Sequence, residues 1–107
     1  GYHVAKGGLE TLVRYYAVKW GSAGIRVNGV APSAFIKEES SIYHHTHPEI
    51  STKMANLTPL CRMGTAAEVA EAVLFLASER ASFVTGQNLV VDGGLTLQLQ
   101  TVPAKRS

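Results

Sequence analysis

Cysteine, long apolar runs and excess charge are all scarce in this 107-residue sequence. The single cysteine, Cys61, excludes an internal disulfide, and no stretch approaches the roughly 20 apolar residues that span a bilayer. The first six residues contain no apolar core of the kind that signal peptides carry. We therefore expect a cytoplasmic protein without a membrane partner.

Basic residues do not gather into a patch. Ten lysines and arginines stand against eight acidic residues, which leaves a net charge of only +2. The one close basic pair, Lys105 and Arg106, lies at the end of the chain. Proteins that bind nucleic acids usually present a basic stripe or a recognisable module. We therefore expect no nucleic-acid partner.

Metal-ligating residues are also few. His44, His45 and His47 lie close together, but at these spacings they do not share one face of a helix, and no cysteine or carboxylate completes a set. We expect no metal site, and we interpret these histidines as part of the polar lining of a substrate pocket. Cys61 is expected to be a small packed residue.

A helix is predicted over residues 2–22. Apolar residues recur at helical spacing from about Val4 to Trp20, and the glycines at 21 and 24 supply a stop. The apolar stripe is broad, and a stripe of that width packs against neighbours on both flanks. Tyr15, Tyr16 and Trp20 are therefore interpreted as packing or subunit-interface residues.

A strand is predicted next, over residues 25–30, because this segment is short, rich in β-branched residues and bounded by glycine and proline. Helix, tight loop and strand in this order make half of a βαβ unit, which predicts an α/β fold with a parallel sheet. Such a sheet carries helices on both faces, and this chain has too few strands to build one alone.

The segment 37–60 is predicted to be a lid. It follows the loop 31–34 at the carboxyl end of the predicted strand, where open α/β sheets bind their ligands. It is polar and weakly periodic, which indicates an excursion with one or two short helices. A long insertion after a ligand-facing strand is more typical of a lid than of a linker.

The last third of the chain predicts one more helix and one more strand. Thr65 and Glu68 have the spacing of a capping box, in which each side chain bonds the backbone N–H of the other residue. The helix is predicted over residues 66–78. A final strand is predicted over residues 88–91, and Asp92 with two glycines ends it.

Tyr2 and Lys6 are the pair with the clearest chemical use. They are four residues apart at the start of the predicted helix, so they share one face. A free phenol has a pKa near ~10, and a neighbouring ammonium lowers the pKa of a phenol by favouring the phenolate. A tyrosine tuned in this way can exchange a proton with a carbonyl or an alcohol. The same spacing also arises by chance in many helices.

Four blocks of sequence together resemble the short-chain dehydrogenase/reductase family, and most closely its 3-oxoacyl-carrier-protein reductase-like branch. The first is similar to the family's active-site helix, the second to its next strand and proline loop, the third to the start of its penultimate helix, and the fourth to its last strand. The blocks are residues 2–9 (YHVAKGGL), 25–32 (IRVNGVAP), 62–70 (RMGTAAEVA) and 85–94 (TGQNLVVDGG).

The resemblance implies the C-terminal part of a Rossmann-type doubly wound parallel sheet, with residues 1–107 belonging to a single domain. It implies an oxidoreductase that transfers a hydride between NAD or NADP and a carbonyl or alcohol substrate. Tyr2 would be the general acid/base. Lys6 would assist Tyr2 and bond the nicotinamide ribose. Pro32 and Phe35 would border the nicotinamide. A homodimer or homotetramer is also implied.

Two departures from the family pattern support an alternative. Ser33 stands where the family usually has glycine, and Lys37 stands where it usually has threonine. The family's glycine-rich phosphate loop and its catalytic serine and asparagine belong to an N-terminal half that is absent from this chain, so residues 1–107 alone are expected to be inactive. The alternative is a non-catalytic homologue that serves as a binding or assembly module.

Overall fold

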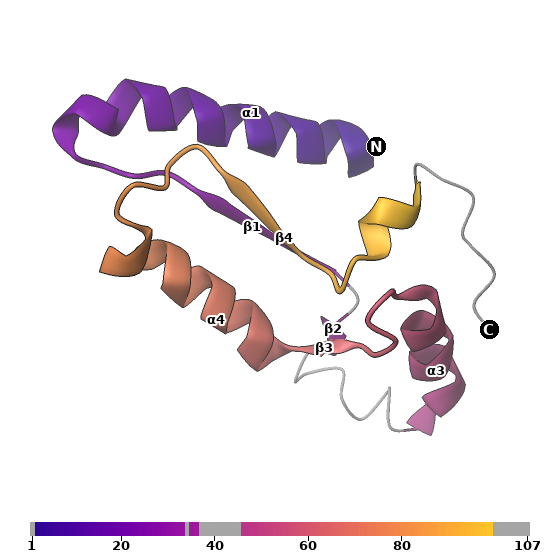
Figure 1. Ribbon diagram of the computed structural model, residues 1–107. Helices are drawn as coiled ribbons and strands as arrows, with labels where there is room; N and C mark the ends of the chain where they lie inside the picture. The colour runs from indigo at the N-terminus through magenta and orange to yellow at the C-terminus, as the bar shows by residue number, and fades with distance from the viewer. Residues whose placement is uncertain (1, 34, 37–45, 100–107) are drawn as a thin grey trace. The chain divides into compact units, whose positions relative to one another are not determined.

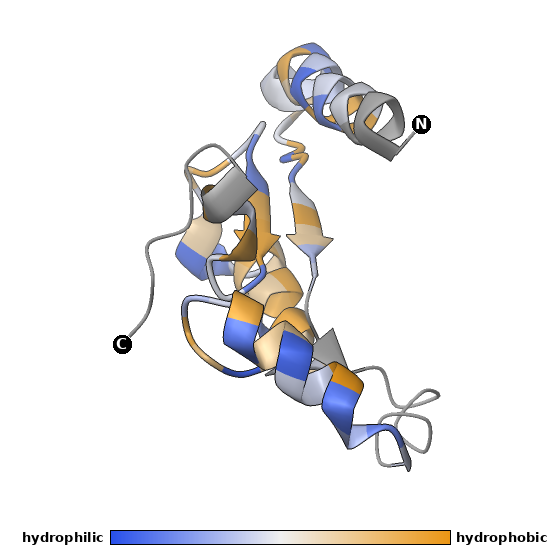
Figure 2. Cartoon of the chain, turned by 90° about the vertical axis from the view of Figure 1, so that its right-hand side faces the viewer, coloured by the Kyte–Doolittle hydropathy of each residue, from blue (hydrophilic) through white to orange (hydrophobic). Residues whose placement is uncertain are grey.

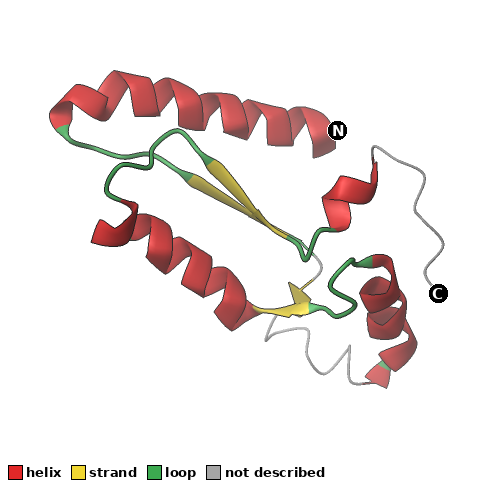
Figure 3. Ribbon diagram, in the orientation of Figure 1, coloured by secondary structure: helices red, strands yellow, loops and turns green. Residues whose placement is uncertain are grey.

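Residues 2–33, 35–36 and 46–99 are described by the computed structural model, with side chains described for residues 7–33 and 46–97. They fall into two units. One unit comprises Gly1–Ala31 and Ala70–Val90, and the other comprises Pro32–Val69 and Val91–Ser107. Helices and strands alternate along the chain, as the colours of Figure 3 show. The predicted α/β class is confirmed.

The first unit contains most of a pair of parallel strands, β1 (Gly29–Pro32) and β4 (Asn88–Val91), whose last residues, Pro32 and Val91, belong to the second unit. Gly29 N–H donates to the Gln87 carbonyl over 2.8 Å, and Ser33 N–H donates to the Val91 carbonyl over 3.1 Å. Donor and acceptor advance in the same direction, which is the pattern of parallel strands. The parallel sheet was predicted, and β4 has the predicted bounds.

Two helices flank this pair. Helix α1 (Tyr2–Trp20) runs along one side, and α4 (Ala66–Ala77) runs along the other (Figure 1). Ala17 of α1 is buried, and a Cβ added to Gly86 would lie 3.4 Å from the Ala17 Cβ, so this helix rests directly on the chain that leads into β4. The 3₁₀ turn η1 (Gly21–Ala23) continues α1 to one residue past the predicted end at residue 22.

The apolar stripe of α1 is as broad as predicted. Its inner side packs on the strands, whereas Leu9, Leu12 and Val18 remain exposed among the described residues. The ring of Tyr16 packs on Trp20 with 4.5 Å between centroids, and Tyr15 meets Tyr16 edge-on at 5.1 Å. Figure 2 shows apolar residues along β1 and β4 and a mixture of polar and apolar residues along α1.

The strand predicted over residues 25–30 begins later, at Gly29. The preceding residues bond to the loop 84–87 through side chains instead of extending the regular ladder. Val27 N–H donates to Thr85 Oγ1, and the Asn28 amide donates to the Val84 carbonyl while accepting from Gln87 N–H. Because of these side-chain bonds, residues 25–28 do not form the regular hydrogen bonds of a strand. The predicted start of the strand at residue 25 was therefore wrong.

Arg26 closes the carboxyl end of α4. Its Nη1 donates to the carbonyls of Leu76 and Val84 over 2.7 and 3.4 Å, and its Nη2 donates to Ser78 over 3.2 Å. The last carbonyls of a helix have no partner within the helix, and a cation there also interacts favourably with the helix dipole. A part-buried guanidinium thus satisfies three acceptors at once.

Arg26→Lys is expected to lower the free energy of unfolding by about 1–2 kcal/mol, because an ammonium cannot reproduce the planar arrangement of three donated bonds. Urea denaturation of the protein measures the change. Arg14→Lys, on the exposed side of α1, is the matched control and should stay within about 0.5 kcal/mol of the wild type. Equal effects at both positions would contradict the capping role of Arg26.

The second unit contains the segment interpreted as a lid. Residues 37–45 lie outside the described residues. The remainder forms α3 (Pro48–Leu57), which confirms the expectation of a short helix and begins with proline at a position where no backbone donor is needed. Strands β2 (Phe35–Ile36) and β3 (Gly64–Thr65) pair in parallel, with Phe35 opposite Gly64.

The carboxyl end of α3 is anchored to the turn after β4. Thr58 is fully buried, and its Oγ1 donates to the Met54 carbonyl over 2.7 Å. Leu60 N–H donates to the Gly93 carbonyl over 3.2 Å. Gly93 has a φ of 63°, and a Cβ there would lie 2.6 Å from Thr58 Cγ2, so the two segments approach as closely as a glycine permits.

Candidate functional site

Tyr2 and Lys6 both lie on α1, in the first unit. In a helix, positions four apart are neighbours on one face, with about 5–6 Å between Cβ atoms. The helical backbone thus gives the pair the spacing that the sequence predicted. Their side chains lie outside the described residues, so the catalytic roles of Tyr2 and Lys6 stay predictions.

Pro32 and Phe35 lie in the second unit. Pro32 is the last residue of β1 and is exposed, and Phe35 opens β2. The side chain of Phe35 lies outside the described residues. Between them, Ser33 is half-buried and continues the bonding to β4 through Val91. Of the two residues that the family resemblance assigned to the nicotinamide, Pro32 thus lies at the carboxyl end of β1 and Phe35 follows it, at the edge where α/β sheets bind ligands.

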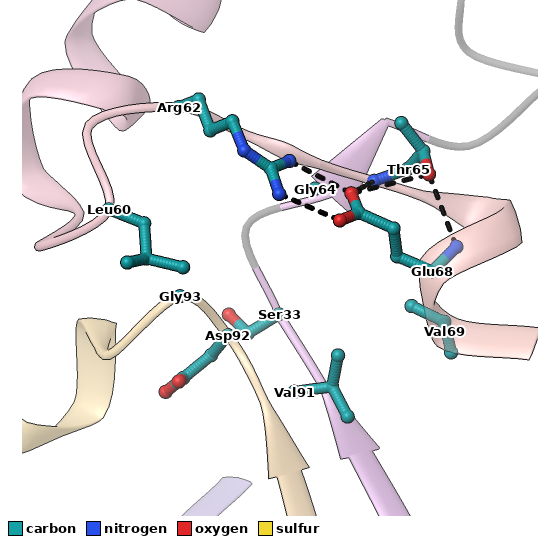
Figure 4. A pocket seen from close by; sticks show the side chains of 10 residues that line it. All are labelled: Ser33, Leu60, Arg62, Gly64, Thr65, Glu68, Val69, Val91, Asp92 and Gly93. Carbon is teal, nitrogen blue, oxygen red and sulfur yellow. Dashed lines mark hydrogen bonds and ion pairs between the residues drawn. The ribbon is translucent and has the colours of Figure 1, made fainter. Parts of the chain in front are cut away.

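A small cavity of about 100 Å³ lies in this unit, where the chain leaves β1 and β4 (Figure 4). It is lined by Ser33, Leu60, Arg62, Gly64, Thr65, Glu68, Val69, Val91, Asp92 and Gly93. Pockets that enclose a drug-sized ligand usually measure about 300–1,000 Å³. This cavity is large enough for a few water molecules but too small for a nicotinamide nucleotide.

Glu68 organises the rim of the cavity. Its carboxylate accepts two bonds from the Arg62 guanidinium, Nη1 to Oε1 over 2.8 Å and Nη2 to Oε2 over 2.7 Å. It also accepts from Thr65 N–H over 3.0 Å, while Glu68 N–H donates to Thr65 Oγ1 over 3.1 Å. The reciprocal Thr65–Glu68 bonds confirm the predicted capping box. Figure 4 shows the bonds from Arg62 and from Thr65 N–H converging on the Glu68 carboxylate.

The contribution of Arg62 was missed by sequence reasoning. Arg62 and Glu68 are separated by β3 and the start of α4, so no regular periodicity brings them together. The signal that could have found the pair is a basic residue shortly before a capping box. Bidentate bonding of this kind fixes both partners more firmly than a single ionic contact does.

The guanidinium of Arg62, together with the Thr65 backbone N–H, lowers the pKa of Glu68 from 4.5 to about 2. The ionised form is the one that makes these bonds, so their contribution to stability is fully present above about pH 4.5 and is lost as the pH falls towards 2. At pH 4, Glu68 is expected to remain ionised while an ordinary glutamate is largely protonated. Carbon-13 NMR of the labelled side-chain carboxylates measures this, and a Glu68 midpoint near 4.5 would contradict it.

Asp92 is buried at the carboxyl end of β4 and has a structural role. Its Oδ1 accepts from Gly94 N–H over 2.8 Å, and its Oδ2 accepts from Thr96 N–H over 2.8 Å and from Thr96 Oγ1 over 2.6 Å. These bonds hold the turn into the short helix η4 (Leu95–Leu99). The sequence predicted a turn at this place but not the buried carboxylate that fixes it.

Cys61 is exposed, so the expectation of a packed residue was wrong. It occupies a left-handed turn with a φ of 59°, where its N–H donates to the Thr58 carbonyl over 2.8 Å. His44 and His45 lie outside the described residues. Within the described ranges, no three histidine, cysteine or acidic residues gather as metal ligands. None of the helices described there combines the length and apolar character that a bilayer span requires.

Comparison with known proteins identifies the fold. The sequence profile of a family described as enoyl-(acyl carrier protein) reductase matches residues 1–96. A galactitol 2-dehydrogenase (L-tagatose-forming) of Cereibacter sphaeroides is 41% identical over 96 residues, which cover 90% of this chain and 37% of that protein. The chain thus spans little more than a third of the length of this relative.

Solved structures agree. A gluconate 5-dehydrogenase from Burkholderia cenocepacia J2315, in complex with NADP and tartrate, superposes with a TM-score of 0.75 and 36% identity over 90% of this chain and 37% of its own. A short chain dehydrogenase family protein from Francisella tularensis superposes with a TM-score of 0.77 and 28% identity, covering 91% of this chain and 43% of its own. The Rossmann-type fold with its parallel strands, the matching profile and these relatives show that the chain belongs to the short-chain dehydrogenase/reductase family of oxidoreductases.

Proposed function

We propose that this chain carries the acid/base half of the active site of an NAD- or NADP-dependent dehydrogenase or reductase acting on a carbonyl or alcohol. The observation that carries the proposal is the family match over residues 1–96, combined with Tyr2 and Lys6 four positions apart on α1. Neither the profile match nor the helix alone assigns chemistry to these residues, whereas together they point to an acid/base pair.

Tyr2 is the proton-transferring group in this proposal. In the reductive direction its hydroxyl donates a proton to the substrate oxygen, and in the oxidative direction its phenolate removes the proton from the alcohol. The ammonium of Lys6 favours the phenolate by its charge and donates to the ribose hydroxyls of the cofactor. When bound, the nicotinamide supplies or accepts the hydride, and the chain supplies orientation and electrostatics.

The residues at the carboxyl end of β1 fit a nicotinamide. Pro32 is exposed there, so an apolar ring surface is available to a planar ligand, and the backbone of Ser33 is fixed by its bond to Val91. Phe35 follows within three positions. We propose that Pro32 and Phe35 border the nicotinamide. Because the gluconate 5-dehydrogenase structure described above contains NADP, both cofactor types, NADH and NADPH, need to be tested.

The remainder of the active site is proposed to lie in sequence outside this chain, because the chain spans 37% of its galactitol-oxidising relative. That part would add the glycine-rich phosphate loop, further strands beside β1 and the catalytic serine and asparagine, all within one domain. Exposed apolar residues on α1 and α4, such as Leu12, Val18 and Leu74, support a homodimer or homotetramer.

The test uses the full-length protein. Isothermal titration with NADH and NADPH measures cofactor affinity, and nicotinamide absorbance follows turnover on a panel of polyols, sugar acids and small ketones. Binding of one cofactor together with turnover of at least one substrate supports the proposal. Absence of binding for both cofactors would overturn it.

The second candidate is a non-catalytic homologue. Ser33 and Lys37 favour this second candidate, because they replace the glycine and threonine that are usual in the short-chain dehydrogenase/reductase family. Cofactor binding without turnover on any substrate of the panel would identify this second function. Tight binding of a protein partner that does not depend on either cofactor would support it further.

A further inference from the structure

The Glu68 carboxylate binds both ends of the segment 62–65, which directly precedes its own helix. Arg62 binds it at one end of a four-residue segment with two donated bonds, and Thr65 binds it at the other end through its backbone N–H. The Arg62 Nη1 also donates to the Met63 carbonyl over 3.2 Å. The segment between the two anchors is therefore fixed at both ends by one side chain, which itself belongs to the first turn of α4.

That segment contains β3, and β3 is the partner of β2. Phe35 lies opposite Gly64, and Ile36 lies opposite Thr65. Strands of two residues are too short to hold their own position, since stable strands usually have about 3–10 residues. The position of β2 therefore depends on whatever fixes β3, and the bonds to Glu68 do so directly.

The loop that ends in β2 is thus held on two sides. Ser33 N–H bonds the end of β4, and the backbone of Phe35 and Ile36 is paired with β3. Ser33, Gly64 and Glu68 all line the same cavity of about 100 Å³, which is too small for a nucleotide. Arg62 and Glu68 therefore hold the loop between β1 and β2 in place within the second unit, and they do not form a pocket for the cofactor.

We propose that Arg62 and Glu68 form a positioning pair that fixes the backbone of Ser33, Phe35 and Ile36 against the nicotinamide and thereby sets the affinity for the nicotinamide half of the cofactor. This inference rests on the proposed function, which places Pro32 and Phe35 beside that ring. The ion pair is exposed on both sides, with 54% and 45% of the side-chain surfaces accessible, so its role is geometric more than stabilising.

Glu68→Gln in the full-length protein separates this role from helix capping. Glutamine retains a side-chain oxygen that can serve in a capping box, but it removes the charge that binds Arg62 at two points. We expect NADH affinity to fall by on the order of tenfold while ADP-ribose, which lacks the nicotinamide, binds within about twofold of wild type. NADPH and 2′-phospho-ADP-ribose replace them if NADPH is the cofactor bound.

Graded variants identify the interaction itself. Arg62→Gln is expected to match Glu68→Gln, Arg62→Lys to be intermediate, and the double variant to be no worse than either single one, because all of them break the same pair. Glu71→Gln, an exposed glutamate one turn further along α4, is the matched control and should leave both affinities unchanged. A general loss of fold would weaken NADH and ADP-ribose alike and would overturn the positioning role.

Hydrogen exchange of the backbone amides in residues 33–36 gives a readout that needs no cofactor. Faster exchange there in Glu68→Gln than in Glu71→Gln supports the proposal. An unchanged ratio of NADH to ADP-ribose affinity in Glu68→Gln would overturn it, even where wild type binds NADH well. If wild type binds neither cofactor, the proposed function fails separately, and unchanged exchange at 33–36 would then overturn the positioning pair as well.

Discussion

Tyr2→Phe in the full-length protein is expected to lower turnover by about 10²–10⁴-fold, while cofactor affinity stays close to that of wild type. Phenylalanine keeps the ring and its volume but lacks the hydroxyl that transfers the proton. The helical backbone of α1 begins at this position, so the substitution removes one polar atom without a change in helix propensity. Turnover is followed by nicotinamide absorbance, and affinity by calorimetry.

Lys6→Ala is the companion variant, because Lys6 is assigned two tasks. Loss of the ammonium should reduce turnover and also weaken cofactor binding, whereas Tyr2→Phe should affect turnover alone. Lys19→Ala, an exposed lysine in the last turn of the same helix, is the matched control and should change neither. Turnover at the wild-type level in Tyr2→Phe would end the catalytic assignment of Tyr2.

Gly93→Ala is expected to lower the free energy of unfolding by about 3 kcal/mol, the sum of a left-handed backbone penalty and a steric clash. Its φ is 63°, and the added Cβ would lie 2.6 Å from Thr58 Cγ2, in a contact that is fully buried on the Thr58 side. Because Thr58 is bonded to Met54, it cannot easily withdraw. Urea denaturation of the full-length protein measures the loss.

Two further variants divide this loss into its parts. Gly24→Ala is also left-handed, with a φ of 79°, but a Cβ there has nothing within 4 Å, so only the backbone penalty of about 1 kcal/mol should be measured. Thr58→Ser removes Cγ2 and keeps the hydroxyl, so it should partly rescue Gly93→Ala. The steric account is wrong if Gly93→Ala costs no more than Gly24→Ala.

Elements defined by local signals were predictable from the sequence. The periodicity of α1, the capping box of α4 and the β-branched run of β4 each depend on residues within a few positions of one another. Their bounds were close to those observed because helix capping and strand propensity act over the same short range. The parallel pairing followed from the order of the elements alone.

The features that were missed depend on side-chain bonds and backbone conformations that follow no regular sequence period. Asn28 bonds to Val84 and Gln87, and this displaced the start of β1 from residue 25 to Gly29. The Arg62–Glu68 pair spans β3, and Cys61 is exposed in a left-handed turn. No periodic pattern predicts these features.

The Arg26 guanidinium also holds together the two ends of the connection between α4 and β4. It bonds the carbonyls of Leu76 and Ser78 before the connection and that of Val84 after it, so all three oxygens must lie within the span of one planar group. Surface connections usually tolerate insertions. An insertion within residues 79–83 is expected to be tolerated only where the added residue bulges outward and leaves these carbonyls within reach of Arg26, because an insertion that separates them would uncap the helix.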